Sequence, residues 1–135
     1  MKITLTKTGD PFQFTAQNES GAQTRMDAST SVGGTNTGLR PMEHLVAALA
    51  GCAAIDLLII LQKKRIEITD LEIDIFAERK EETPSAFRSI QLQFKVAGAA
   101  PESVYPVAGR VLEKYCSVAA SLHPDISITH TVNEL

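Results

Sequence analysis

The sequence has little of what several functional classes need. It contains no Trp, two Tyr and five Phe, so it offers no row of aromatic rings on which nucleic-acid bases could stack. Its formal net charge is -3, which indicates no basic surface for nucleic acid or for an anionic membrane. We therefore expect neither a nucleic acid nor a membrane among its partners.

Motifs for metals and bound cofactors are also missing. The two cysteines do not form a C-x-x-C pair, and the three histidines, His44, His123 and His130, are scattered along the chain, so a zinc site has little support. Gly33-Gly34 stands in a loop without the lysine and hydroxyl residue of a phosphate-binding motif. We expect no metal and no bound cofactor.

An export signal is not evident. The stretch "MKITLTKTGDPFQF" lacks the apolar core of a signal peptide, so the expected location is the cytoplasm, where the two cysteines would be free thiols or a redox pair rather than a permanent disulfide. The apolar run 45–61 is somewhat short of a hydrocarbon core of ~30 Å and contains Asp56. We expect it to be a buried helix of a soluble domain.

What is present suits one domain, residues 1–135, because 44% of the residues are hydrophobic and the length leaves little room for two cores. Alternating polar and apolar residues predict strands over 2–7, 12–17, 22–27, 66–80, 88–98 and 125–132, with a phase slip near Thr69 that indicates a bulge or bend. Helices are expected from Pro41 to about Lys63 and from Pro101 through Cys116 to about Leu122. The fold class is α+β, in the order βββ-α-ββ-α-β.

The first predicted helix is apolar nearly all the way round. A helix without a polar stripe has to be covered on every side, and a single sheet from a chain this short covers one side only. We therefore expect an intertwined homodimer in which a second copy covers the rest.

Cys52 stands between Gly51 and Ala53, and these small neighbours would let another group approach its sulfur. Each cysteine taken alone can be a small buried hydrophobe, whereas two cysteines on separate buried helices favour a redox pair, and both interpretations stay open. Asp56, one turn after Cys52, is expected to make a structural hydrogen bond, because an acid within an apolar run needs a partner. It is a poor activator of Cys52, because an adjacent anion disfavours a thiolate.

Glu43 lies in the first turn of the predicted helix, where the helix dipole favours an acid. It could instead tune a thiol. Nine residues separate Glu43 from Cys52, which is roughly 13 Å along a helix and half a turn around it. On one straight helix the two cannot share a site, so Glu43 would act near a Cys52 sulfur only across a dimer interface. His44 is expected to cap the helix or to meet solvent.

Two stretches carry a resemblance to a known family. "PMEHLVAALAGCAAID" resembles the first cysteine motif of the OsmC/Ohr superfamily, the osmotically inducible and organic hydroperoxide resistance proteins, and "EKYCSVAASL" with "ISITHTV" resembles its second cysteine motif and last strand. The residues of these motifs are most similar to those of a small bacterial subgroup of this superfamily. The resemblance implies an OsmC-like fold and an intertwined homodimer with two interfacial sites.

The resemblance also implies a chemistry. Cys52 would attack the O–O bond of a small organic hydroperoxide, Cys116 would resolve the product as a disulfide, and an external dithiol reductant of the lipoyl type would restore both thiols. Glu43 matches the family's acid, which pairs with an arginine. The first hairpin, "KTGDPF", contains no arginine, so Lys7 or Arg40 is the candidate substitute. Binding of a small apolar ligand, or redox sensing by the same cysteines, remains the alternative function.

Overall fold

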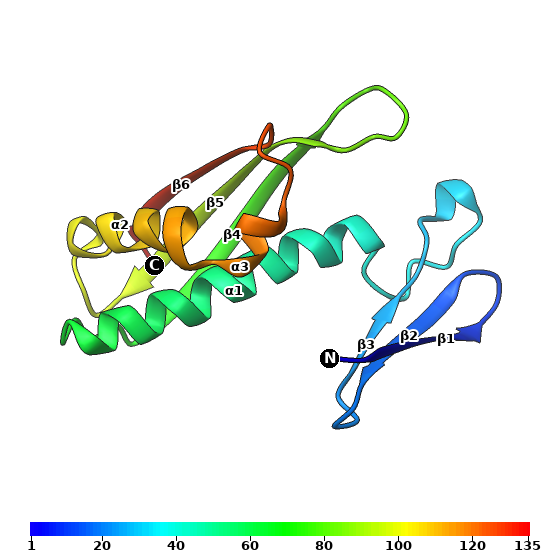
Figure 1. Ribbon diagram of the computed structural model, residues 1–135, viewed down its shortest axis with the longest axis horizontal. Coiled ribbons are helices and arrows are strands. Elements are labelled where there is room, and N and C mark those ends of the chain that lie inside the picture. The colour runs from blue at the N-terminus through cyan, green and yellow to red at the C-terminus, as the bar shows by residue number, and fades with distance from the viewer. The chain divides into compact units, whose positions relative to one another are not determined.

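The computed structural model describes residues 1–135, which form two compact units, Met1–Leu45 and Val46–Leu135. Three strands, a helix, two strands, a broken helical segment and a final strand follow one another along the chain (Figure 1). This order confirms the predicted α+β class and the sequence of elements. The single-domain organisation and the homodimer stay predictions.

The first unit is built on an antiparallel meander. Strands β1 (Ile3–Gly9), β2 (Gln13–Asn18) and β3 (Gln23–Met26) lie side by side in chain order. The turn between β2 and β3 is held by the side-chain oxygen of Asn18, which accepts hydrogen bonds from the backbone N–H groups of Ser20 and Ala22. Asn is a turn residue for this reason, and the three predicted strands are confirmed.

The loop after β3 is anchored by one buried carboxylate. Asp27 is 2% exposed, and its two oxygens accept hydrogen bonds from the backbone of Ala28 and from both the backbone and the hydroxyl of Thr35 and of Thr37. These bonds, that of the Thr35 hydroxyl first, hold the pKa of Asp27 well below its usual range. Gly34 fits because a Cβ there would stand 2.1 Å from the carbonyl oxygen of Ala28. The loop therefore has a defined shape, despite its polar, glycine-rich composition.

The second unit is a three-stranded sheet with helices on one face. In it, β5 (Phe87–Ala97) lies between β4 (Asp70–Arg79), to which it is antiparallel, and β6 (Ser127–Glu134), to which it is parallel. Helix α1 (Pro41–Lys63), from Val46 on, and α2 (Pro101–Arg110) lie over the same face (Figure 1). The β4–β5 hairpin confirms the pairing that the sequence predicted.

The core of this unit joins α1 to β5. The residues of α1 at four-residue spacing that are buried form one stripe: Leu49, Ala53, Leu57 and Leu61. In β5 every second residue from position 90 on is apolar and buried: Ile90, Leu92, Phe94 and Val96. The helix is long and apolar enough to cross a membrane, but its buried stripe packs as the core helix of a globular protein does.

The side of α1 away from this core is uncovered in the single chain. Ile55 is 63% exposed, and Leu58 and Ile59 are each 44% exposed. Such a row of exposed aliphatic side chains on one helix marks a surface that gains free energy when something covers it. The helix is thus covered on one side only, and the remaining side is available to a further partner.

The predicted second helix is not continuous, and this expectation was wrong. After α2 the chain makes one π-helical turn, η2 (Val111–Tyr115), then Cys116 takes an extended backbone with ψ 105°, and a short helix α3 (Ser117–Ser121) follows. The apolar spacing in this stretch is compatible with a helix throughout. The structure instead breaks the helix at Cys116, where the side chain is buried and its Sγ accepts the N–H of Ala119.

Strand β4 also begins later than predicted. Its ladder starts at Asp70, whereas Ile66 and Ile68 lie in the connection from α1. The phase slip near Thr69 is therefore the start of the strand and not a bulge within it. The irregularity in the β4–β5 ladder lies at the other end, between Glu78 and Arg79.

Candidate functional site

Two cysteines from distant parts of the chain are neighbours in the second unit. Cys52 lies in the middle of α1 and is partly exposed, while Cys116 follows η2 and is 2% exposed. Cys52 lies near enough to Cys116 to contribute to the raised pKa of the Cys116 thiol. Both thiols are free. The pair thus combines one sulfur that solvent can reach with one that it cannot.

The Cys116 sulfur is held by the backbone on both sides. It accepts a hydrogen bond from the N–H of Ala119 at 3.4 Å and donates to the carbonyl oxygen of Leu49 at 4.0 Å. Burial raises the pKa of the Cys116 thiol, and the neighbouring Cys52 adds to this effect, because a buried thiolate loses its hydration. Cys116 is therefore kept as a protonated thiol at neutral pH.

The break in the second helical segment is what brings Cys116 to this position. The π-helical turn ends at Tyr115, and the N–H of Cys116 still bonds to the carbonyl of Val111 at 2.9 Å. The extended backbone of Cys116 then turns its side chain toward α1, where it meets Leu49. Single π-helical turns occur frequently at functional sites, and here one sets the direction of a thiol.

Gly51, next to Cys52, has no packing reason within the chain. A Cβ placed on Gly51 would meet nothing within 4 Å, and Gly in a helix interior costs about 1 kcal/mol relative to Ala. The open space beside the exposed cysteine therefore serves no contact in this chain. It leaves room for another molecule to approach Cys52 closely, as the small neighbours of this residue indicated.

Glu43, in the first unit, is bound to Arg40. The guanidinium Nη1 of Arg40 lies 2.9 Å from Glu43 Oε1, and the backbone N–H of Arg40 donates to Glu43 Oε2 at 2.9 Å. The second bond is the one that an acid at the third helical position makes to the residue before a helix. Glu43 thus has a structural role at the start of α1, and it holds a cation beside its charge.

The other candidates near the helix start have structural partners. Lys7 pairs with Asp10 on an exposed turn, so of the two proposed substitutes for the family arginine only Arg40 binds Glu43. The ring of His44 bridges the hydroxyl of Thr24, at 2.9 Å from Nε2, and the carbonyl of Arg40, at 3.2 Å from Nδ1. His44 therefore fastens the start of α1 to β3, within the first unit.

Asp56 does not have the structural hydrogen bond that the sequence led us to expect. It is half-buried and forms no hydrogen bond or ion pair in the chain, and it lines a cavity between α1 and α2. His130 stacks on Tyr105 with ring centroids 4.5 Å apart, and His123 accepts the N–H of Asp125. Neither histidine adds a catalytic group to the cysteine pair, and no group of three metal-binding side chains is present.

Sequence reasoning missed Asp27, although a signal was available. Asp27 precedes "ASTSVGGTNT", and a carboxylate followed by closely spaced Thr residues is typical of side chain to backbone bonding in turns. It fixes the loop that ends at Arg40, since its own N–H donates to the carbonyl of Leu39 at 3.2 Å. Its effect on the Arg40–Glu43 pair is thus an indirect one.

Comparison with known proteins identifies the family of the chain. Residues 34–131 match the family model described as OsmC-like protein. The chain is 38% identical over 120 residues to Protein YhfA of Escherichia coli strain K12, which covers 87% of each chain. The resemblance that the two cysteine motifs carried is therefore confirmed.

Solved structures show the same fold. An OsmC-like protein from Mycoplasma pneumoniae superimposes with a TM-score of 0.81 at 21% identity, covering 99% of this chain and 96% of that one. An organic hydroperoxide resistance protein from Legionella pneumophila superimposes with a TM-score of 0.74 at 11% identity, covering 100% and 98%. At these identities the likeness concerns the fold alone.

Proposed function

Because the chain belongs to the OsmC-like protein family, we propose that it reduces organic hydroperoxides with Cys52 and Cys116. Membership of this family supports a role in redox chemistry or in peroxide stress. The observation that supports this most directly is the pair itself: a partly exposed thiol beside a buried one, 64 positions apart in sequence. A solvent-reachable sulfur can meet an oxidant, and a protected neighbour can react with what forms there.

In the first step the Cys52 thiolate attacks one oxygen of the hydroperoxide. An S–O bond forms and the O–O bond breaks, so the peroxide is reduced to an alcohol, whose oxygen takes up a proton. The Cys52 sulfur is oxidised by two electrons to sulfenic acid. Gly51 leaves the space that the organic part of the substrate needs beside this sulfur.

In the second step Cys116 loses its proton and attacks the oxidised sulfur of Cys52. An S–S bond forms, the S–O bond breaks and water leaves. An external dithiol then exchanges twice with this disulfide, regenerates both thiols and becomes a cyclic disulfide itself. The raised pKa of Cys116 fits this order of events, since a thiol that stays protonated is not the first to be oxidised.

Arg40 takes the place of the family arginine in this proposal. It is paired with Glu43 at 2.9 Å, so its guanidinium is held by a carboxylate instead of moving freely. Because Glu43 and Cys52 are nine residues apart on one helix, the pair would support the Cys52 thiolate of a second chain in a homodimer. The exposed Ile55 and Leu58 of α1 belong to the apolar surface that such a partner would cover.

In this proposal the protein reduces hydroperoxides in the cytoplasm, as part of the response to oxidative stress. The Legionella structure with the same fold is described as an organic hydroperoxide resistance protein, and a dithiol-dependent cycle needs a reducing compartment. No bound cofactor is part of the cycle, because the electrons arrive from the external dithiol.

The test is to titrate the reduced protein with cumene hydroperoxide and to count free thiols. The expected result is the loss of two thiols per chain for one peroxide consumed, and repeated turnover when a lipoyl-type dithiol is added. Cys52→Ser should abolish consumption, whereas Cys116→Ser should allow one turnover and leave a sulfenic acid that dimedone traps. Full consumption by Cys52→Ser would overturn the proposal, and oxidation without turnover would favour redox sensing.

The choice of oxidant provides a second measurement. Exposed Ile55 lies one turn from Cys52, and apolar area in contact with an organic tail contributes roughly 25 cal/mol per Å². Cumene hydroperoxide should therefore oxidise Cys52 faster than hydrogen peroxide by about tenfold. Equal rates would show that the tail makes no contact.

A further inference from the structure

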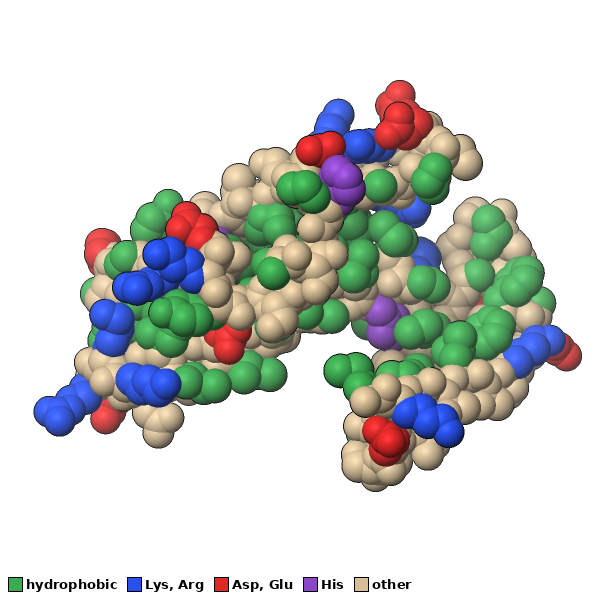
Figure 2. Space-filling view, viewed as in Figure 1, with side chains coloured by type: hydrophobic (Ala, Val, Ile, Leu, Met, Phe, Trp, Pro, Cys, Tyr) green, Lys and Arg blue, Asp and Glu red, His purple; other side chains and the backbone are tan.

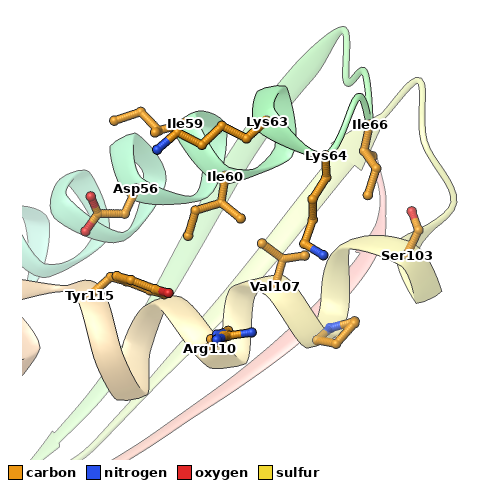
Figure 3. Close-up of a pocket in the computed structure, with 11 residues that line it drawn as sticks. Asp56, Ile59, Ile60, Lys63, Lys64, Ile66, Ser103, Val107, Arg110 and Tyr115 are labelled. Carbon is orange, nitrogen blue, oxygen red and sulfur yellow. The ribbon is translucent and has the colours of Figure 1, made fainter.

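A second site lies in the same unit, apart from the cysteines. A cavity of about 620 Å³, open to solvent, lies between the end of α1 and α2 (Figure 3). This volume is typical of a pocket for a small organic ligand. Neither Cys52 nor Cys116 lines it, and the hydroperoxide chemistry makes no use of it.

The floor of the cavity is apolar. Ile59 and Ile60 of α1 and Val107 of α2 line it from facing helices, and Ile66 closes one end. In Figure 3 Ile60 and Val107 point toward each other between the two helix ribbons, and Ile59 lies on the outer side of α1. An apolar tail placed along them would lose contact with water, which is favourable.

Cations surround this apolar floor. Lys63, Lys64 and Arg110 all line the cavity, are exposed, and form no ion pair or hydrogen bond in the chain. Against these three stands a single acid, Asp56. Figure 2 shows Lys and Arg side chains gathered around hydrophobic ones where the end of α1 meets α2.

The position of two of these cations at helix ends explains part of this charge. Lys63 lies in the last turn of α1 and Arg110 in the last turn of α2, where cations interact favourably with the helix dipole. An interaction with the helix dipole does not require these side chains to point toward the same space. In Figure 3 Lys64 extends from α1 toward α2, on which Arg110 lies, whereas Lys63 runs back along α1 toward Asp56. Two cations without a partner in the chain therefore border the apolar cavity, one from each side.

We propose that this cavity binds an anionic amphiphile, with a carboxylate or phosphate head between Lys64 and Arg110 and an apolar tail along Ile59, Ile60 and Val107. The proposal goes beyond peroxide reduction, because binding needs neither cysteine. A second copy of the chain is a poorer occupant. A two-fold axis through the cavity would set its cations against the same cations of the partner.

The experiment is calorimetric titration of the full-length protein with decanoate below its micellar concentration. We expect saturable binding of one decanoate per chain, roughly tenfold weaker binding of octanoate since two methylenes leave the floor, and much weaker binding of uncharged decanol. Decyl phosphate in the same titration identifies the preferred head. Lys64→Gln and Arg110→Gln should each weaken binding by about tenfold, and Asp56→Asn should strengthen it.

Matched controls come from the same helical segments. Lys114 is an exposed cation that does not line the cavity, so Lys114→Gln should leave binding unchanged. Leu58 and Ile59 are equally exposed at 44%, but only Ile59 lines the cavity, so Ile59→Ala should weaken binding and Leu58→Ala should not. Cys52→Ser should bind decanoate as well as the natural chain does, which separates this site from the peroxide chemistry.

Three results would overturn the proposal. The first is the absence of saturable binding. The second is an equal loss of affinity in Lys114→Gln, which would indicate attraction by charge without a site. The third is a shift of the monomer–dimer balance by Lys64→Gln and Arg110→Gln with no change in decanoate binding, which would make a second copy the occupant.

Discussion

Arg40 and Glu43 are joined by two bonds of equal length: the guanidinium and the backbone N–H of Arg40 each lie 2.9 Å from a different carboxylate oxygen of Glu43. The backbone bond belongs to the start of α1 and would be useful in any helix. The guanidinium bond holds a charge in place and has no such general role, since an ion pair with both side chains nearly half exposed adds little to stability. The two bonds can be tested separately.

Substitution of Glu43 by Gln or Ala separates the two functions. Glu43→Gln can still accept the Arg40 N–H and should lower the free energy of unfolding by no more than about 0.5 kcal/mol, whereas Glu43→Ala loses the cap and should cost about 1 kcal/mol. Both remove the charge, so both should slow oxidation of Cys52. Urea denaturation and thiol counting measure the two effects. If Glu43→Gln is oxidised as fast as the natural chain, the carboxylate serves the helix alone.

Gly51 tests whether a second chain approaches α1. In an uncovered helix Gly51→Ala should raise the free energy of unfolding by about 1 kcal/mol, because a Cβ meets nothing in the chain. If a partner helix lies close, Gly51→Leu should weaken the dimer strongly. Analytical ultracentrifugation at low micromolar concentration distinguishes these results. Glu113→Leu, at an exposed position outside α1, is the control, and a natural chain that sediments as a 14.6 kDa monomer would contradict the dimer.

The hydrogen bonds of the buried Asp27 should make the stability of the folded chain depend on pH. Its pKa in the folded chain is lowered, chiefly by the Thr35 hydroxyl, so its contribution is fully present above the unfolded pKa of about 3.9 and is lost as the pH falls toward the folded pKa. Asp27→Asn should lower the melting temperature by several degrees at pH 7, and the difference from the natural chain should shrink below pH 4. Asp70 is exposed at the start of β4 and its carboxylate forms no hydrogen bond in the chain, so Asp70→Asn should show no such difference.

Cys116 should react slowly with alkylating agents. Since burial raises its pKa and solvent does not reach it, iodoacetamide at pH 8 should modify Cys52 first, which mass spectrometry of the digested protein can follow. The raised pKa also means that folding favours the protonated thiol. The free energy of unfolding should therefore fall as the pH rises above about 8.5, the value for a free thiol. In Cys116→Ser this alkaline decline should be weaker, and faster labelling of Cys116 than of Cys52 would contradict the assignment.

The strands and α1 could be predicted from the sequence because their patterns are local. Alternation over ten residues defines the β4–β5 hairpin, and Pro41 with Glu43 defines the start of α1. The break at Cys116 could not, since it depends on where a sulfur is buried against Leu49, a residue 67 positions away. The same limit applies to the cavity. In the sequence Arg110 and Lys64 are 46 positions apart, and only the packing of α2 beside α1 shows that they line the same cavity.

The parallel pairing of β5 with β6 has a consequence for the making of the chain. The most buried strand, β5, ends at Ala97, and its second neighbour starts only at Ser127. During synthesis the backbone N–H and C=O groups on one edge of β5 therefore stay unpaired until about thirty further residues have been added. An unpaired strand edge of this kind can pair with other chains. The β1–β2–β3 meander has no such delay because its contacts are local. A ribosome stalled before residue 127 should thus hold a chain with an ordered first meander and an aggregation-prone second sheet.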